Sequence, residues 1–271
     1  MLVGDWLKAA TQQLQQAGIE TARLDCLVLL EDRLNKNRTQ LLAHPEGKID
    51  GEQLKYLWEA IDRRVKHEPL AYIRGKTEFY GREFIITKHV LEPRPESEAM
   101  IDLLKAATLP PTPHIADVGA GSGALGVTAK LELPSAHVSL IEIDEHALTV
   151  AQKNVNKFSI SAACTLSDLL AKTDVRYDVV LANLPYVPDN FQINPAALME
   201  PRIAIFGGPD GLDVYRRLFT QLKRLSAPVS FIFTEALPPQ HSELKDIARL
   251  SGYRLTRTED FIQQFEPLRK G

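Results

Sequence analysis

The chain has few cysteines and no long apolar run. Its two cysteines, Cys26 and Cys164, lie far apart among 271 residues without a neighbouring ligand pattern. This argues against a disulfide framework and a zinc site. No apolar segment approaches the roughly 20 residues that a membrane helix needs. Asp5 and Lys8 interrupt the start of the chain, where a signal peptide would be apolar. We therefore expect a cytoplasmic protein without a membrane partner.

An excess of positive charge is also lacking. The chain has 32 Lys and Arg against 35 Asp and Glu, which gives a formal net charge of -3. No general positive field exists to attract nucleic acid, so we expect no direct nucleic-acid partner. An apolar fraction of 44% with 25% charged residues is typical of a folded globular protein. The length predicts about two domains, and we expect a monomer.

The pattern of apolar residues predicts three successive regions. Residues 1–75 repeat apolar side chains at helical spacing and are expected to form a helical domain. Thr21 is expected to cap its second helix, and Asp50 with Gln53 resembles a capping box. Residues 76–92 change to a strand-like period and predict a β-hairpin connector. Residues 93–271 are expected to form a second, larger domain.

From His114 onward, strands and helices are predicted to alternate, which indicates an α/β fold with a largely parallel sheet covered on both faces. The expected strands are 115–118, 138–143, 162–166, 178–182, 229–234 and 253–258. The expected helices are 125–133, 147–156, 212–225 and 242–250.

A glycine-rich segment lies where the first of these strands ends and a helix begins. It reads Asp117-Val118-Gly119-Ala120-Gly121-Ser122-Gly123. Glycines allow a tight turn there, and the amides at the start of the helix can donate to a polar ligand. Glu142 ends the next strand, where a carboxylate can accept hydrogen bonds from both hydroxyls of a ribose. The segment therefore predicts a nucleotide-like cofactor.

The glycine spacing leaves two cofactors open. Gly119, Gly121 and Ala124 satisfy the dinucleotide pattern G-x-G-x-x-A, and Gly121, Gly123 and Gly126 satisfy G-x-G-x-x-G, so a nicotinamide-dependent oxidoreductase must be weighed. Asp117, two residues before the first glycine, favours S-adenosylmethionine. So does the third glycine, which comes one residue early for the dinucleotide spacing of that register.

A second motif, Asn183-Leu184-Pro185-Tyr186, directly follows the strand predicted over 178–182. Ligands bind at the carboxyl ends of strands in such sheets. The side chain of Asn183 and the carbonyl of Leu184 can both accept hydrogen bonds from one planar NH2 group, and the ring of Tyr186 can lie against its plane. Pro185 restricts Leu184 to extended backbone angles. The motif therefore predicts a clamp that points a nitrogen at a methyl donor.

Together these motifs resemble the peptide chain release factor glutamine methyltransferases, and the resemblance spans nearly the whole chain. It also rests on Ala22-Arg23-Leu24-Asp25, Glu68-Pro69-Leu70-Ala71-Tyr72-Ile73, Glu78-Phe79-Tyr80-Gly81, Pro93-Arg94-Pro95-Glu96-Ser97-Glu98, Glu200-Pro201-Arg202, Gly207-Gly208 and Asp210-Gly211-Leu212.

The resemblance implies a class I methyltransferase domain, Rossmann-like, with seven strands of which the last is antiparallel. It implies an N-terminal helical domain that grips the release factor. The substrate it implies is the glutamine of a Gly-Gly-Gln loop, methylated on its side-chain nitrogen (N5). S-adenosylmethionine would be bound by Asp117, Gly119, Ala120, Gly121, Ser122, Gly123, Glu142, Asp168, Leu169 and Asn183. The glutamine would be held by Asn183, Leu184, Pro185 and Tyr186, with Asn183, Pro185 and Tyr186 as the catalytic set.

The chain departs from the family in two places. The family usually has Asn-Pro-Pro-Tyr, whereas Leu184 stands second here, and it often has a large residue near Leu169. Asn-Leu-Pro-Tyr also resembles ribosomal RNA adenine dimethyltransferases, which lack the helical N-terminal third. A ribosomal protein glutamine methyltransferase, an NAD-dependent oxidoreductase and a non-catalytic cofactor-binding protein are further alternatives.

Overall fold

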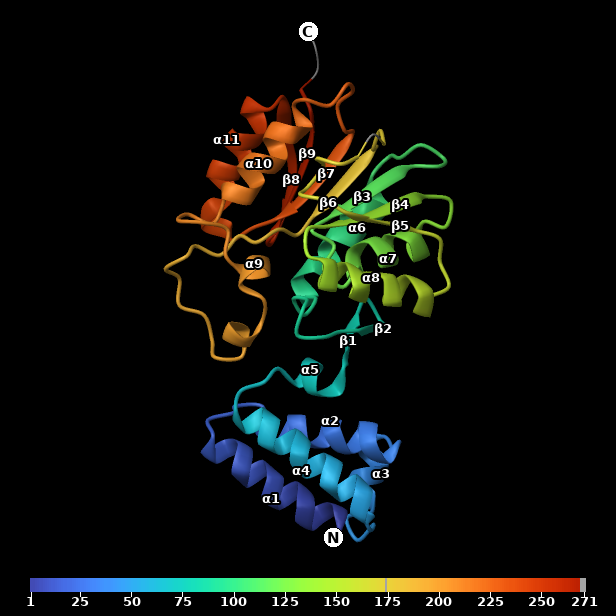
Figure 1. The fold of residues 1–271 in the computed structure, drawn as a ribbon, viewed down its shortest axis with the longest axis vertical. Coiled ribbons are helices and arrows are strands. Elements are labelled where there is room, and N and C mark those ends of the chain that lie inside the picture. The colour runs from blue at the N-terminus through green and yellow to red at the C-terminus, as the bar shows by residue number, and fades with distance from the viewer. Residues whose placement is uncertain (174, 269–271) are drawn as a thin grey trace. The chain divides into compact units, whose positions relative to one another are not determined.

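The computed structural model describes residues 1–173 and 175–268. These form two compact units, coloured from blue to red along the chain in Figure 1. The first contains residues 1–75 together with 193–199, and the second contains residues 76–192 with those from 200 onward. In the described part of the chain, no helix combines the length and apolar content needed to cross a membrane.

The first unit is a helical bundle around Trp6, Leu30 and Leu57, all fully buried. Its helices are α1 (Val3–Gln16), α2 (Ala22–Leu34), α3 (Arg38–Ala43), α4 (Gly51–Val65) and α5 (Leu70–Arg74). The capping box of Asp50 and Gln53 at α4 is confirmed. The predicted cap at Thr21 is wrong. Its side chain makes no cap hydrogen bond, because its ψ of 13° lies outside the extended region that an N-cap residue needs.

The predicted β-hairpin is present in the second unit as β1 (Lys76–Phe79) and β2 (Arg82–Ile85). Phe79 and Phe84 pack into the core of that unit. The fully buried side chain of Asn154 fixes the end of the hairpin, because its Oδ1 accepts from Ile85 N at 2.8 Å and its Nδ2 donates to Ile85 O at 2.9 Å.

The sheet of the second unit has seven strands in the order β5-β4-β3-β6-β7-β9-β8. They are β3 (His114–Val118), β4 (His137–Glu142), β5 (Ala163–Leu166), β6 (Val179–Ala182), β7 (Phe231–Glu235), β8 (Tyr253–Glu259) and β9 (Ile262–Pro267). The last strand, β9, is antiparallel to both of its neighbours. The Rossmann-like fold class is thus confirmed. Strand β9 could not be found from periodicity, because the polar Gln263 occupies a buried position in it.

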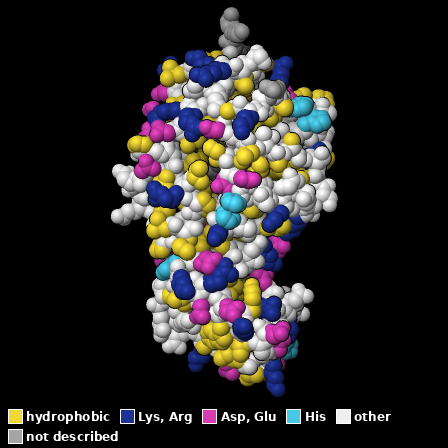
Figure 2. All heavy atoms as spheres, in the orientation of Figure 1, with side chains coloured by type: hydrophobic (Ala, Val, Ile, Leu, Met, Phe, Trp, Pro, Cys, Tyr) yellow, Lys and Arg dark blue, Asp and Glu magenta, His cyan; other side chains and the backbone are white. Residues whose placement is uncertain are grey.

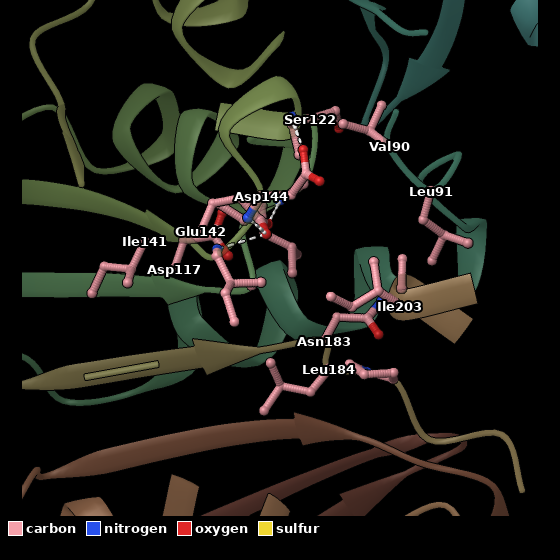
Figure 3. Close-up of a pocket in the computed structure, with 18 of the residues that line it drawn as sticks. Val90, Leu91, Asp117, Ser122, Ile141, Glu142, Asp144, Asn183, Leu184 and Ile203 are labelled. Atoms are coloured by element: carbon pink, nitrogen blue, oxygen red, sulfur yellow. Dashed lines mark hydrogen bonds between the residues drawn. The ribbon is translucent and has the colours of Figure 1, made fainter. Parts of the chain in front are cut away.

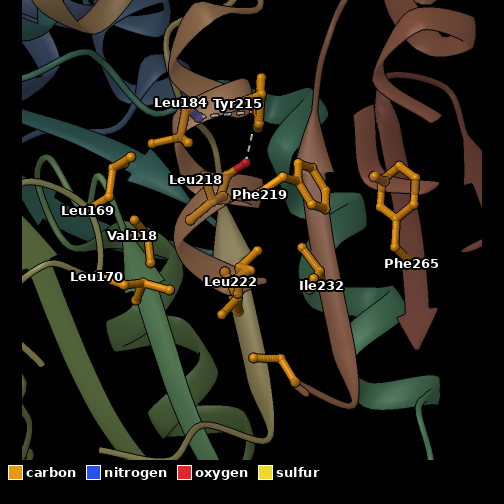
Figure 4. Packing of buried hydrophobic residues seen from close by; sticks show 14 of the residues in the cluster. Val118, Leu169, Leu170, Leu184, Tyr215, Leu218, Phe219, Leu222, Ile232 and Phe265 are labelled. Atoms are coloured by element: carbon orange, nitrogen blue, oxygen red, sulfur yellow. Dashed lines mark hydrogen bonds between the residues drawn. The ribbon is translucent and has the colours of Figure 1, made fainter. Parts of the chain in front are cut away.

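Helices cover both faces of this sheet (Figure 1). One face carries α6 (Glu98–Ala106), α7 (Ala124–Glu132) and α8 (Glu145–Lys157), and the other carries α10 (Asp213–Leu222) and α11 (His241–Leu250). Short helical turns are η1 (Pro95–Ser97), η2 (Ala197–Met199), α9 (Arg202–Ile205) and η3 (Pro238–Gln240). Figure 4 shows the core on the α10 side, where Phe219 and Leu222 pack against Ile232 and Phe265.

Candidate functional site

A pocket lies at the carboxyl ends of β3, β4 and β6 (Figure 3). It brings together eleven of the thirteen site residues expected from the sequence: Asp117, Gly119, Ala120, Gly121, Ser122, Glu142, Asp168, Leu169, Asn183, Leu184 and Pro185. Gly123 and Tyr186 do not line it. Gly123 is the N-cap residue of α7. The hydroxyl of Tyr186 donates to Glu235 Oε1 at 2.9 Å.

The glycine loop follows β3 in a left-handed backbone conformation. Gly119, Gly121 and Gly123 have φ angles of 75°, 55° and 78°. Residues other than glycine rarely adopt such positive φ angles. The amides of Gly119 and Ala120 donate to the carbonyl of Ile141, at 2.8 and 3.1 Å. The loop is therefore tied to the end of β4.

Asp117, in β3, supports this loop through a hydrogen bond to the start of α7. Its Oδ2 accepts a hydrogen bond from the amide of Gly126 at 2.7 Å, and the residue is 1% exposed. Burial raises the pKa of the Asp117 carboxyl to about 7, against the lowering by the Gly126 amide, and the charge of Glu142 raises it further. Asp117 thus holds the first turn of α7 against β3. Asn154 donates from Nδ2 to the carbonyl of Ser122 at 2.8 Å and fixes the other side of the loop.

Glu142, at the end of β4, is one of the acidic residues that line the pocket. Its Oε2 accepts from the amide of Gly121 at 2.8 Å, and its Oε1 accepts from those of Ile143 and Asp144 at 2.8 and 3.0 Å. A carboxylate has about four acceptor positions. The side chain is therefore fixed in orientation and still has capacity for a ligand hydroxyl.

The segment after β5 lines the pocket with Asp168 and Leu169. The carboxylate of Asp168 pairs with Arg217 of α10, and both side chains are about half exposed. Leu169 is 7% exposed and has a φ of 52°. Gln221 holds this strained turn, because its Oε1 accepts from the amide of Leu170 at 2.7 Å. This wall combines an apolar surface with a charged rim.

Asn183 follows β6 and is held by two side chains. Its Nδ2 donates to Ser97 Oγ at 2.9 Å and to Glu235 Oε2 at 3.0 Å. Ser97 donates to the same Oε2 at 2.5 Å, and Tyr186 donates to Oε1 at 2.9 Å. Glu235 is 1% exposed, and burial raises its pKa while these hydrogen bonds lower it. Among the described residues, none donates a hydrogen bond to Oδ1 of Asn183, which is therefore open to a ligand.

The backbone after Asn183 is also fixed. The amide of Leu184 donates to the hydroxyl of Tyr215 at 3.3 Å, as the dashed line in Figure 4 shows, and that hydroxyl lies 2.5 Å from the carbonyl of Glu235. The Leu184 side chain is buried in the core. Within the described chain the Leu184 carbonyl accepts no hydrogen bond. Asn183 Oδ1 and Leu184 O are thus two acceptors without a donor, on residues that line the pocket.

Glycines on a later loop permit close packing against this backbone. A Cβ on Gly207 would lie 2.3 Å from the carbonyl oxygens of both Pro185 and Gly211. Gln240 donates from Nε2 to the carbonyl of Tyr186 at 2.8 Å. The loop of residues 183–186 is therefore enclosed from behind.

Sequence reasoning missed Ser97, Glu235 and Tyr215. Glu235 had a readable signal, because it ends the apolar strand β7, the neighbour of β6, and strand ends in parallel sheets carry ligand-binding residues. Ser97 belongs to a family motif whose role was not predicted. In the structure Arg94 of that motif pairs with the buried Glu200 of another motif, which ties residues 93–98 to the loop after residue 199.

No group of three or more His, Cys, Asp or Glu that could hold a metal ion occurs among residues 1–173 and 175–268. On the face drawn in Figure 2, acidic and basic side chains are interspersed.

Comparison with known proteins identifies relatives of both regions. Residues 5–75 match the family described as PrmC N-terminal domain, and residues 95–199 match the one described as methyltransferase small domain. A release factor glutamine methyltransferase of Moorella thermoacetica is 37% identical over 252 residues, which cover 91% of this chain and 89% of that protein. One from Koribacter versatilis is 33% identical and covers 88% and 89%.

Solved structures share the fold at low identity. A methyltransferase from Pyrococcus furiosus has a TM-score of 0.52 at 14% identity, covering 80% of this chain and 97% of that one. A 16S rRNA methyltransferase of T. thermophilus, in complex with AdoMet and guanosine, has a TM-score of 0.52 at 18% identity, covering 72% and 50%. At such identities the likeness shows the fold alone.

Proposed function

The chain belongs to the family of release factor glutamine methyltransferases, and we propose that it transfers a methyl group from S-adenosylmethionine to the side-chain nitrogen of the glutamine in the Gly-Gly-Gln loop of a release factor. The observation that carries this proposal is the pair of open acceptors, Asn183 Oδ1 and Leu184 O, beside the glycine loop.

The pocket fits S-adenosylmethionine. Glu142 is fixed by three backbone amides and keeps capacity for the ribose hydroxyls. The buried Leu169 offers an apolar surface to the adenine. The glycines of residues 119–123 let the backbone approach the ligand closely. When bound, S-adenosylmethionine supplies a methyl group on a positively charged sulfur.

Asn183 and Leu184 then act on the glutamine. Their oxygens accept one hydrogen bond from each N–H of the amide, which orients the nitrogen and raises its electron density. An amide nitrogen is a weak nucleophile, so alignment must supply most of the acceleration, up to roughly 7–11 kcal/mol in well-oriented systems. The nitrogen gains the methyl carbon, the bond from that carbon to sulfur breaks, and one amide proton leaves to solvent.

We propose that residues 1–75 recognise the release factor and residues 93–271 perform the transfer, with 76–92 as connector. The separate core around Trp6 and the family match over residues 5–75 support this division. We also propose that the protein acts as a monomer in the cytoplasm, with no direct contact to nucleic acid.

Hydrogen exchange of the full chain tests the recognition role of residues 1–75, since adding the release factor should protect amides within them. Unchanged exchange there would contradict this role.

Two measurements separate this function from the alternatives. Calorimetry should show binding of S-adenosylmethionine and none of NAD. Labelled methyl transfer should then mark a purified release factor and leave its Gln→Ala variant unlabelled. Labelling of ribosomal RNA or of a ribosomal protein in place of the factor would favour one of the other methyltransferases.

A further inference from the structure

A buried carboxylate at the end of β7 contacts three donors behind the pocket. Glu235 receives hydrogen bonds from Ser97 Oγ, Asn183 Nδ2 and the hydroxyl of Tyr186, at 2.5, 3.0 and 2.9 Å. The residue is 1% exposed, so solvent does not replace these partners. Glu235 does not line the pocket, and any effect on the substrate must pass through a residue that does.

The sheet itself places this carboxylate beside Asn183. Strands β6 and β7 are parallel, and Ala182 is paired with Thr234. The residues that follow this pair, Asn183 after β6 and Glu235 at the end of β7, therefore lie side by side at the same level of the sheet. Their contact follows from the register of the sheet.

An ionised carboxylate can only accept hydrogen bonds. Only the NH2 end of Asn183 can therefore face it, and the oxygen of the planar side-chain amide must project the other way. We infer that Glu235 is a positioning residue that fixes the rotation of the Asn183 amide, so that Oδ1 faces the NH2 group of the substrate glutamine. This inference rests on the proposed function and adds a residue to its site.

Without this partner, Asn183 could turn its amide over. Its NH2 group would then face the NH2 group of the glutamine, and two donors would meet without an acceptor, so the hydrogen bond that orients the substrate nitrogen would be lost. Ser97 cannot prevent this, because a hydroxyl both donates and accepts. Of the two side chains within hydrogen-bond distance of Nδ2 of Asn183 in the described chain, Ser97 and Glu235, the carboxylate is the one that distinguishes the two rotations.

The first test replaces the carboxylate by an amide of the same shape. Glu235→Gln should lower kcat at least tenfold, roughly the effect of one hydrogen bond in a buried site, and leave the affinity for S-adenosylmethionine unchanged. Glu132→Gln is the control, since Glu132 pairs with Arg82 and Lys105 outside the pocket. It should keep the wild-type kcat. Thermal unfolding of both variants measures any general loss of stability.

The second test exchanges donor and acceptor. Asn183→Asp alone puts two carboxylates in contact and should be poorly active. Combined with Glu235→Gln, the new amide can donate to the new carboxylate and to Ser97 Oγ, while its oxygen accepts from Tyr186. The second oxygen of the residue at 183 then faces the substrate as an acceptor. The double variant should recover kcat by about tenfold over either single variant, which a merely structural role would not produce.

The results separate the possible failures. If wild-type protein does not label the release factor, the proposed function fails. If it does, and Glu235→Gln retains the wild-type kcat, only the positioning role fails. A double variant no more active than expected from multiplying the two single losses also overturns the role. If Glu235→Gln folds poorly, the double variant decides alone, because its hydrogen bonds are complete.

Discussion

A Cβ placed on Gly119 would lie 2.8 Å from Cδ2 of Leu184. The loop proposed to hold the cofactor and the loop proposed to hold the glutamine are thus in direct contact. Leu184, which stands where the family usually has proline, is buried at this contact. Its side chain packs against the glycine loop at the wall of the pocket, and its backbone carbonyl has no hydrogen-bond donor within the described chain.

Gly119→Ala should destabilise the second unit and weaken cofactor binding. The substitution forces a left-handed alanine, which costs about 1–2 kcal/mol, and overpacks Leu184, which costs about 1–3 kcal/mol more. Gly252→Ala is the matched control, because Gly252 has a φ of 90° with nothing within 4 Å of its Cβ position. Thermal unfolding and calorimetry with S-adenosylmethionine measure both variants. Equal losses of stability and of cofactor affinity in the two variants would show that the contact with Leu184 contributes nothing to either quantity.

Asn183→Ala should reduce kcat by roughly 100-fold or more, as removal of one positioned hydrogen-bonding group does in other enzymes. The affinity for S-adenosylmethionine should change far less, because the clamp acts on the glutamine. Single-turnover methyl transfer and cofactor titration separate the two quantities. An active Asn183→Ala variant would remove Asn183 from the mechanism.

Glu142→Ala should weaken binding of S-adenosylmethionine by roughly 10- to 100-fold, the value of a hydrogen bond to a charged group. The variant also loses the acceptor for the amide of Gly121. Calorimetry measures the affinity, and kcat at saturating cofactor should stay near the wild-type value. Unchanged affinity would mean that the carboxylate serves only the backbone turn.

The buried Asp117 should make stability depend on pH. Its pKa is about 7 in the folded protein against 3.8 for an ordinary carboxyl. The folded state therefore binds the proton more tightly, and the stability that this provides is present below pH 3.8 and lost as the pH rises through 7. At about 1.4 kcal/mol per unit, the full effect is about 4 kcal/mol.

Asp117→Asn should abolish that dependence while keeping an oxygen for the Gly126 amide. The free energy of unfolding of the wild type, relative to the variant, should fall between pH 4 and pH 7. Denaturant titrations of the cofactor-free protein at several pH values measure it. Parallel curves for the two proteins would show that Asp117 does not titrate in this range.

The sheet and the glycine loop could be predicted because their signals are local. Apolar strands alternate with helices, and the glycines follow the strand that ends at Val118. Strand β9 was hidden by the buried Gln263, whose neighbours no local pattern reveals. The contacts of Asn183 were hidden for the same reason, since Ser97 and Glu235 lie 86 and 52 residues away in the chain. The sequence indicates Asn183 as the candidate clamp residue, and only the tertiary structure shows that its side chain contacts Ser97 and Glu235.

The most direct test of the proposed function is the position of the methyl group on the product. Wild-type protein, S-adenosylmethionine and a purified release factor are incubated, and the peptide containing Gly-Gly-Gln is sequenced by mass spectrometry. The account predicts one added methyl group on the side-chain amide of that glutamine, and none when Asn183→Ala replaces the wild type. A methyl group on another residue would contradict it, and so would an unmodified peptide after incubation with the wild-type protein and S-adenosylmethionine.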